Sequence, residues 1–114
     1  MTIPKEGALL RIFLGERDRY EGKLLYQAIV RKAREHHLAG ATVLRGLMGF
    51  GRNSRMHTAK LLSLSEDLPI VVEIVDSREK INLLLPWLDE VVKDGLVTLE
   101  KVQVIRYAGE GRKS

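Results

Sequence analysis

Apolar residues alternate with polar ones, or run together briefly, in four stretches of the chain. This pattern predicts β-strands at residues 8–14, 41–48, 69–75 and 97–107. Two intervening stretches repeat apolar residues every three or four positions, as one face of an amphipathic helix does. They predict helices at about residues 18–37 and 76–92. The predicted order is strand, helix, strand, strand, helix, strand.

Polar residues at both expected helix starts have the spacing of capping boxes. Asp18 is followed three positions later by Glu21, and Asp76 by Glu79. We therefore expect Asp18 and Asp76 to cap the two helices. Gly95 lies where a glycine that ends the second helix is expected.

Two split strand–helix–strand units predict one α+β domain over residues 1–114, a ferredoxin-like βαββαβ sandwich. Its sheet is antiparallel, both helices cover one face, and a long loop joins the second and third core strands. The other face of the sheet is then bare. Apolar residues of the strands cannot all face the helices or solvent favourably, among them Leu9, Phe13, Leu44, Val72 and Ile74. We expect part of this surface to contact another copy of the chain.

The composition excludes several classes of site. The chain has 114 residues, 45% of them hydrophobic, which suits one domain with a core. It has no cysteine, which excludes disulfides, iron–sulfur clusters and thiolate metal sites. The first residues lack the apolar core of a signal peptide, and no apolar run approaches the about 18 residues of a membrane span. We expect a cytoplasmic protein.

The charge is unevenly distributed. The net charge is +4 and the pI is about 9.6, but residues 30–64 carry most of the basic excess, and acids dominate residues 65–94. This regional polarity suits a local anion site, or copies that pack basic face to acidic face, as well as it suits nucleic acid. An RNA-recognition module of this order needs stacking aromatics on its central strands. Residues 69–75 contain none, so no nucleic-acid partner is expected.

Candidate catalytic or metal-binding groups are few. His36 and His37 are adjacent and point about 100° apart on a helix, so they do not chelate together. His57 lies in the long loop, where it could serve a ligand or face solvent. No serine, histidine and acid share a nucleophile motif, so neither a metal nor catalysis is expected. Glu73 is a carboxylate inside an apolar strand, where it could accept a hydrogen bond from a ligand or a neighbouring chain, or point outward.

The connection after the second strand is long and polar. We expect it to be mobile over about residues 52–67, with a possible short strand at residues 60–64, and the tail 109–114 to be flexible. It opens with a glycine-rich stretch that contains Gly46, Gly49, Phe50, Gly51 and Arg52. Glycine allows close approach of a ligand or another backbone, and arginine offers a fork of donors to phosphate or carboxylate. The alternative is a bulge or turn with a solvated arginine.

Three segments resemble PII signal-transduction proteins. The sequence Gly-Phe-Gly-Arg at 49–52 is similar to the motif that opens the long T-loop of that family. Residues 69–75 resemble the strand after the loop, and residues 104–110 resemble the C-terminal stretch that contributes phosphate-binding arginines. The resemblance covers nearly the whole chain. It is closest to a bacterial PII-like family of unknown function with a G-x-x-GFG segment, a nearby histidine and a PIVVEIVD-type strand.

The resemblance implies a homotrimer that binds ligands in clefts between subunits. The ligand would be AMP, ADP, ATP or another small anion, and no cofactor is expected. The second C-terminal arginine of PII proteins is replaced here by Ala108, which leaves the number of phosphates open. The candidate nucleotide-binding residues are Gly49, Phe50, Gly51, Arg52, Glu73 and Arg106. The candidate partner-contact residues of the loop are Asn53, Arg55 and His57.

The leading hypothesis is a non-enzymatic PII-like regulator whose long loop changes order with ligand and contacts a partner protein. A membrane transporter or an ion channel is one kind of partner that the resemblance implies. Two alternatives stay open. One is a metal-tolerance-type or structural trimer without nucleotide, and the other is a small ferredoxin-like enzyme.

Overall fold

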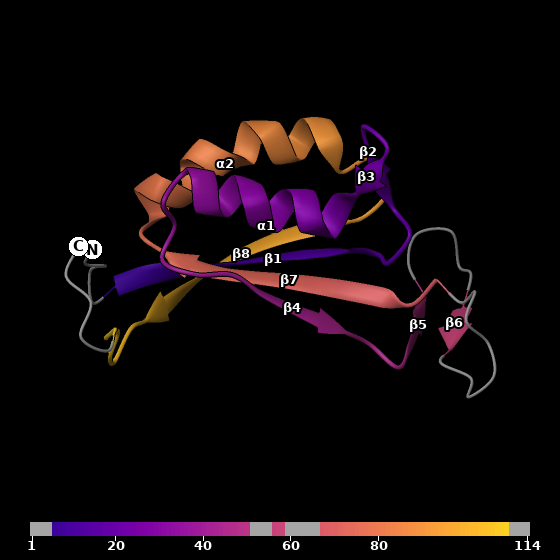
Figure 1. Ribbon diagram of the computed structural model, residues 1–114. Helices are drawn as coiled ribbons and strands as arrows, with labels where there is room; N and C mark the ends of the chain where they lie inside the picture. Colours follow the sequence, from indigo (N-terminus) through magenta and orange to yellow (C-terminus); the bar gives the residue numbers. More distant parts are fainter. Residues whose placement is uncertain (1–5, 51–55, 59–66, 110–114) are drawn as a thin grey trace.

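The computed structural model describes residues 6–50, 56–58 and 67–109. Its centre is a four-stranded antiparallel sheet in the order β4-β7-β1-β8, and both helices lie on one face of it (Figure 1). These elements are β1 (Glu6–Gly15), β4 (Thr42–Arg45), β7 (Pro69–Asp76), β8 (Leu96–Gln103), α1 (Leu25–Glu35) and α2 (Arg78–Val91). The predicted ferredoxin-like α+β sandwich is confirmed.

The core lies between the sheet and the two helices. Alternate residues of β1 and β7 are buried on the helix side, as the period of two along a strand requires. The buried strand residues are Ala8, Leu10, Ile12, Leu14, Ile70, Val72 and Ile74. The buried helix residues recur every three or four positions: Leu25, Ile29, Ala33, Ile81, Leu84, Leu88 and Val91. Val72 and Ile74 therefore belong to the core rather than to the bare face.

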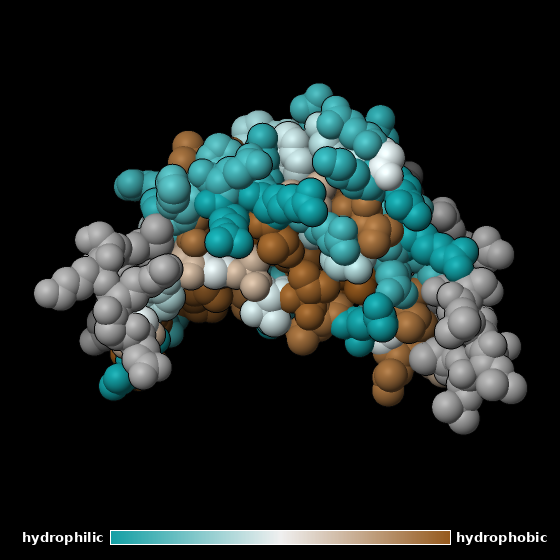
Figure 2. All heavy atoms as spheres, viewed as in Figure 1, coloured by the Kyte–Doolittle hydropathy of each residue, from teal (hydrophilic) through white to brown (hydrophobic). Residues whose placement is uncertain are grey.

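The opposite face of the sheet carries a row of apolar side chains across all four strands. The register pairs Leu44 with Val71, Val71 with Phe13, and Phe13 with Leu96. We call these four residues the apolar row. Leu44 is 49% exposed and Leu96 is 56% exposed. Figure 2 shows hydrophobic residues along the hollowed underside of the molecule, away from the helices.

The first helix begins later than the sequence predicts. Residues 19–24 form a small hairpin of β2 (Arg19–Tyr20) and β3 (Lys23–Leu24), whose turn has positive φ at both Glu21 (50°) and Gly22 (78°). Two positive φ angles fit a type I′ turn, which matches the twist of a hairpin. The predicted capping box of Asp18 and Glu21 is therefore wrong, because Glu21 lies in the turn of this hairpin and not in the first turn of a helix.

Asp18 stabilises the region in another way. Its carboxylate accepts a hydrogen bond from the N–H of Gly15 at 3.0 Å. Its backbone carbonyl accepts one from the N–H of Leu25 at 2.7 Å. Asp18 therefore joins the end of β1 to the start of α1, although it is not the helix cap.

The second helix begins at Arg78 with Ser77 as its N-cap, so the predicted cap at Asp76 is wrong by one residue. The Ser77 hydroxyl accepts the N–H of Lys80 at 3.2 Å, as an N-cap does. Asp76 is instead buried, at 1% exposure. Its carboxylate accepts the N–H groups of Ser77 at 2.6 Å and Ala39 at 2.8 Å.

The end of the second helix also differs from the prediction. α2 ends at Val91, with Val92 as its C-cap, so Gly95 is not the residue that ends it. A Cβ at Gly95 would overlap the carbonyl oxygen of Phe13. The glycine is needed because the backbone of β1 passes close to it.

The second and last strands are shorter than predicted. β4 ends at Arg45 rather than at residue 48, and the chain then forms a separate pair of β5 (Met48–Phe50) and β6 (Met56–Thr58). β8 ends at Gln103, and residues 104–109 have no regular structure. The short strand predicted at residues 60–64 lies outside the described residues.

Candidate functional site

The base of the long loop is packed against the first residue of β7. A Cβ on Gly46 would lie 2.8 Å from Cγ of Pro69, and one on Gly49 would lie 3.2 Å from the same atom. The Gly46 N–H also donates to the carbonyl of Pro69 at 2.7 Å. The two glycines of the G-x-x-G segment therefore allow the β5–β6 pair to lie against β7. Sequence reasoning missed this role, since the position of Pro69 is set by strand pairing.

The described part of the loop base presents apolar side chains to solvent. Leu47 is 78% exposed and Phe50 is 67% exposed, and Met48 between them is also exposed. Of the predicted loop residues, His57 lies in β6 with its backbone paired to Gly49. Four others, Gly51, Arg52, Asn53 and Arg55, lie outside the described residues.

The second end of the loop is attached to the turn that follows β1. Asp67 accepts the N–H of Arg17 at 2.7 Å, and the carbonyl of Leu68 accepts the N–H of Glu16 at 2.8 Å. Glu16 also pairs with Arg45, the last residue of β4. The described residues on both sides of the loop are thus held at one end of the sheet.

Carboxylates gather at this attachment. Burial raises the pKa of Asp18, and the negative charges of Asp67 and Asp94 raise it further. The hydrogen bond from the N–H of Gly15 opposes these effects. The folded protein therefore favours the protonated form of Asp18 more than an exposed aspartate would.

Arg106 lies at the opposite end of the sheet from the loop base. β7 and β8 are both antiparallel to β1, so they run in the same direction, with Pro69 and Leu96 at one end. Arg106 is exposed and follows the other end of β8, beyond Gln103. β7 alone spans about 25 Å, so Gly49 and Arg106 of one chain cannot reach the same small ligand (Figure 1).

The end of the sheet near Arg106 has its own concave surface. A groove of about 850 Å³ lies beside the start of β1, the end of β8 and the start of α2. Arg78 and Lys101 line it with positive charge, and Glu6 and Glu100 with negative charge. Next to Arg106, the Tyr107 hydroxyl donates to the carbonyl of Ala39 at 2.8 Å.

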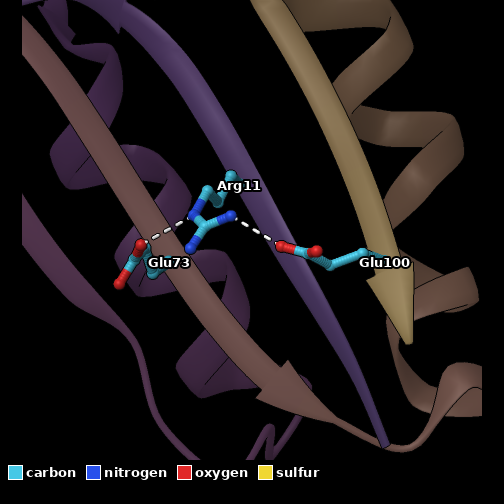
Figure 3. A network of polar contacts seen from close by, with 3 residues as sticks. All are labelled: Arg11, Glu73 and Glu100. Carbon is cyan, nitrogen blue, oxygen red and sulfur yellow. Dashed lines mark hydrogen bonds and ion pairs between the residues drawn. The ribbon is translucent and has the colours of Figure 1, made fainter. Parts of the chain in front are cut away.

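Glu73 lies on the bare face of the sheet, in the middle of β7. Its carboxylate accepts a hydrogen bond from Nε of Arg11 at 2.8 Å, and Nη1 of Arg11 donates to Glu100 at 2.6 Å (Figure 3). The hydrogen bond from Arg11 to Glu73 is the main reason that the pKa of Arg11 is raised. Sequence reasoning missed Arg11, although its position opposite Glu73 follows from the alternation of two paired strands. The ligand role of Glu73 stays a prediction.

Two features are absent from the described part of the chain. Within 6–50, 56–58 and 67–109, no three histidine or carboxylate side chains are grouped so that they could hold a metal ion. In the same ranges no helix has the length and apolar character needed to cross a membrane.

Several solved structures of PII-like proteins are similar to this chain. The chain is similar to CPII from Thiomonas intermedia K12 bound to ADP and bicarbonate, with a TM-score of 0.68 and 19% identity over 89% of this chain and 90% of that chain. It is also similar to CPII, a nitrogen regulatory PII-like protein of the same source, bound to ADP, AMP and bicarbonate, with a TM-score of 0.63 and 20% identity over 89% and 90%. The fold is therefore that of the PII-like class.

The sequence model of the DUF190 family, described as Uncharacterized ACR, COG1993, matches residues 7–104, and the chain belongs to this family. A UPF0166 protein of Aquifex aeolicus (strain VF5) is 44% identical over 100 residues, 85% of this chain and 91% of that protein. A UPF0166 protein of Methanocaldococcus jannaschii is 38% identical over 103 residues, 90% of this chain and 93% of that protein. The resemblance to a PII-like family of unknown function is confirmed.

Proposed function

We propose that this protein is a non-enzymatic PII-like regulator that binds an adenine nucleotide between the subunits of a homotrimer. The observation that carries the proposal is the separation of the two predicted half-sites. Gly49 and Arg106 lie at opposite ends of one sheet. A single ligand can contact both only if they come from different copies of the chain.

The bare sheet face supports the subunit contact. The apolar row crosses all four strands, and its Leu44 and Leu96 are about half exposed. Burying such a surface against other copies is favourable by about 25 cal/mol per Å² of apolar area. The Arg11–Glu73–Glu100 network lies on the same face, so charged groups as well as apolar ones would meet another copy there.

The choice of an adenine nucleotide as the proposed ligand is based on the fold and on Arg106. The two CPII structures contain ADP, and one of them also contains AMP. Arg106 would donate charge-assisted hydrogen bonds to a phosphate. The residues of the loop end that would meet it across the cleft are Gly49, Phe50, Gly51 and Arg52.

Regulation would pass through the loop. The ligand must favour one arrangement of the loop over another if it is to shift their populations. Leu47, Met48 and Phe50 expose apolar area at the loop base, which a protein partner could cover. A membrane transporter or an ion channel is the kind of partner that we propose, with Asn53, Arg55 and His57 among its contacts.

Calorimetry with AMP, ADP, ATP and cyclic AMP tests the proposal. Arg106→Ala should weaken nucleotide binding about ten-fold or more, because a hydrogen bond to a charged group contributes about 1.5–3 kcal/mol. The oligomer should survive, since Arg106 is exposed and lies outside the core. Arg31→Ala is the control, because Arg31 is an exposed arginine of α1 in the helix layer.

Three outcomes decide between the alternatives. Binding by the wild type and the control but not by Arg106→Ala supports the site. Equal binding by all three proteins keeps the nucleotide and rejects Arg106. An intact trimer that binds none of the four nucleotides would favour a structural or metal-tolerance-type role.

A further inference from the structure

Three side chains, two from the junction of β7 and α2 and one from the C-terminal segment, hold the backbone between α1 and β4. Nζ of Lys80 donates to the carbonyl of His37 at 2.9 Å. The carboxylate of Asp76 accepts the N–H of Ala39 at 2.8 Å, and the hydroxyl of Tyr107 donates to the carbonyl of Ala39 at 2.8 Å. Both backbone groups of Ala39 are therefore bonded to side chains.

Asp76, whose carboxylate accepts the N–H of Ala39, is held in place by its surroundings. Asp76 is 1% exposed and also accepts the N–H of Ser77, so its carboxylate is fixed where β7 meets α2. Ala39 is fixed in turn, because a buried carboxylate that lost one of its donors would be left partly unsatisfied. The carbonyl that faces Tyr107 thus belongs to a well-anchored piece of backbone.

Tyr107, which donates the hydrogen bond to the carbonyl of Ala39, lies in a segment without regular secondary structure. Residues 104–109 form no helix or strand, and Ile105 is 82% exposed. The hydrogen bond from Tyr107 to Ala39 is a side-chain tether between this segment and the folded body. Arg106, the neighbour of Tyr107, therefore extends from a backbone that is tied down one residue away.

We propose that Tyr107 is the positioning residue of the nucleotide site: its hydroxyl holds the C-terminal segment on Ala39 and so orders Arg106 before the ligand arrives. The inference rests on the proposed function, and it adds the contact that would hold Arg106 in place before the ligand binds. A side chain on an ordered backbone binds more tightly, because less conformational freedom is lost when the ligand binds. Tyr107 itself need not contact the ligand.

Tyr107→Phe tests this directly, because it removes the hydroxyl and keeps the ring. The change should weaken ADP binding by about two- to ten-fold, the equivalent of one net hydrogen bond. In the Arg106→Ala background the same change should have almost no further effect, since a positioning residue acts only through the group that it positions. If Arg106→Ala binds too weakly to measure, the affinity of Tyr107→Phe relative to the wild type and the exchange experiment below decide.

Amide hydrogen exchange on the ligand-free protein gives a second readout. Residues 104–109 should exchange faster in Tyr107→Phe than in the wild type, while β7 and α2 should be unchanged. Tyr26→Phe, the same substitution in α1, is the control and should alter neither the exchange of this segment nor the affinity for ADP.

The outcomes separate this inference from the proposed function. If Arg106→Ala weakens ADP binding but Tyr107→Phe binds like the wild type, the site stands and the positioning role is overturned. Additive effects of the two substitutions would also overturn it, because Tyr107 would then act independently of Arg106. If the wild type binds no nucleotide, the proposed function fails, the positioning role fails with it, and the exchange experiment reports only on the tether.

Discussion

At the residue scale, short-range packing explains positions whose chemistry alone is ambiguous. Gly46 and Gly49 leave room for the ring of Pro69, and Gly95 leaves room for the carbonyl of Phe13. Asp18 and Asp76 both looked like helix caps in the sequence. In the structure each accepts backbone N–H groups that join separate elements, Gly15 in the first case and Ala39 in the second.

The raised pKa of Asp18 predicts a pH-dependent stability. Burial raises this pKa above its ordinary value of 3.8, so the charged form is less favourable in the folded chain than in the unfolded one. The resulting loss of stability is absent below the unfolded pKa and fully present above the folded pKa. Asp18→Asn removes the charge and keeps an oxygen for the N–H of Gly15. Its stability relative to the wild type should therefore rise between pH 4 and pH 7.

Urea unfolding of both proteins at the two pH values measures this difference. Asp89→Asn is the matched control, because Asp89 is exposed on α2. A difference between Asp18→Asn and the wild type that stays constant across the two pH values would contradict the prediction.

At the scale of helices and strands, the sequence predicted which segments form each kind of element better than it predicted where each element begins and ends. The strand and helix cores were correctly predicted because each repeats its apolar residues at its own period. The start of α1 was wrong because Asp18 and Glu21 have the spacing of a capping box, although residues 19–24 form a hairpin. The end of β4 was wrong because its partner β7 begins at Pro69, so the pairing of the two strands stops there and β5 pairs with β6 instead.

The loop base gives a prediction at this scale. Gly46→Ala should destabilise the protein by about 1–3 kcal/mol, the usual penalty for forcing extra volume into a packed contact. The added Cβ would lie 2.8 Å from the Pro69 ring, which has little freedom to move. Chemical denaturation measures the change. At Gly40, nothing lies within 4 Å of an added Cβ, so Gly40→Ala should have little effect. Similar effects of the two substitutions would refute the packing explanation.

At the scale of the whole molecule, the sheet separates two surfaces with different tasks. One face is covered by α1 and α2, and the other carries the apolar row and the Arg11 network. The two ends of the sheet carry the loop base and the segment around Arg106. In this arrangement the proposed site would be completed only by neighbouring copies.

A charge in the apolar row should prevent assembly. Light scattering of the wild type should give a mass near three times 12.9 kDa. Leu44→Lys should lower this mass toward that of one chain, because a lysine at the subunit contact would have to lose its hydration. Leu83→Lys is the matched control, since Leu83 is 60% exposed on α2 and lies in the helix layer. A wild-type monomer, or a Leu44→Lys protein that keeps the full mass, would exclude this face as the contact.

The order of the four sheet strands and two helices, the antiparallel sandwich and the bare apolar face all followed from the sequence, because periodicity is a local property that neighbouring residues encode. The motifs at the two proposed half-sites could also be recognised in it. Only the tertiary structure decided which residues meet. The bonds from Arg11 to Glu73 and Glu100 join positions 62 and 89 residues apart, and the bond from Tyr107 to Ala39 joins positions 68 apart. Such contacts depend on strand register and on how the helices cross the sheet, and these are fixed by the packing of the whole core rather than by any segment alone.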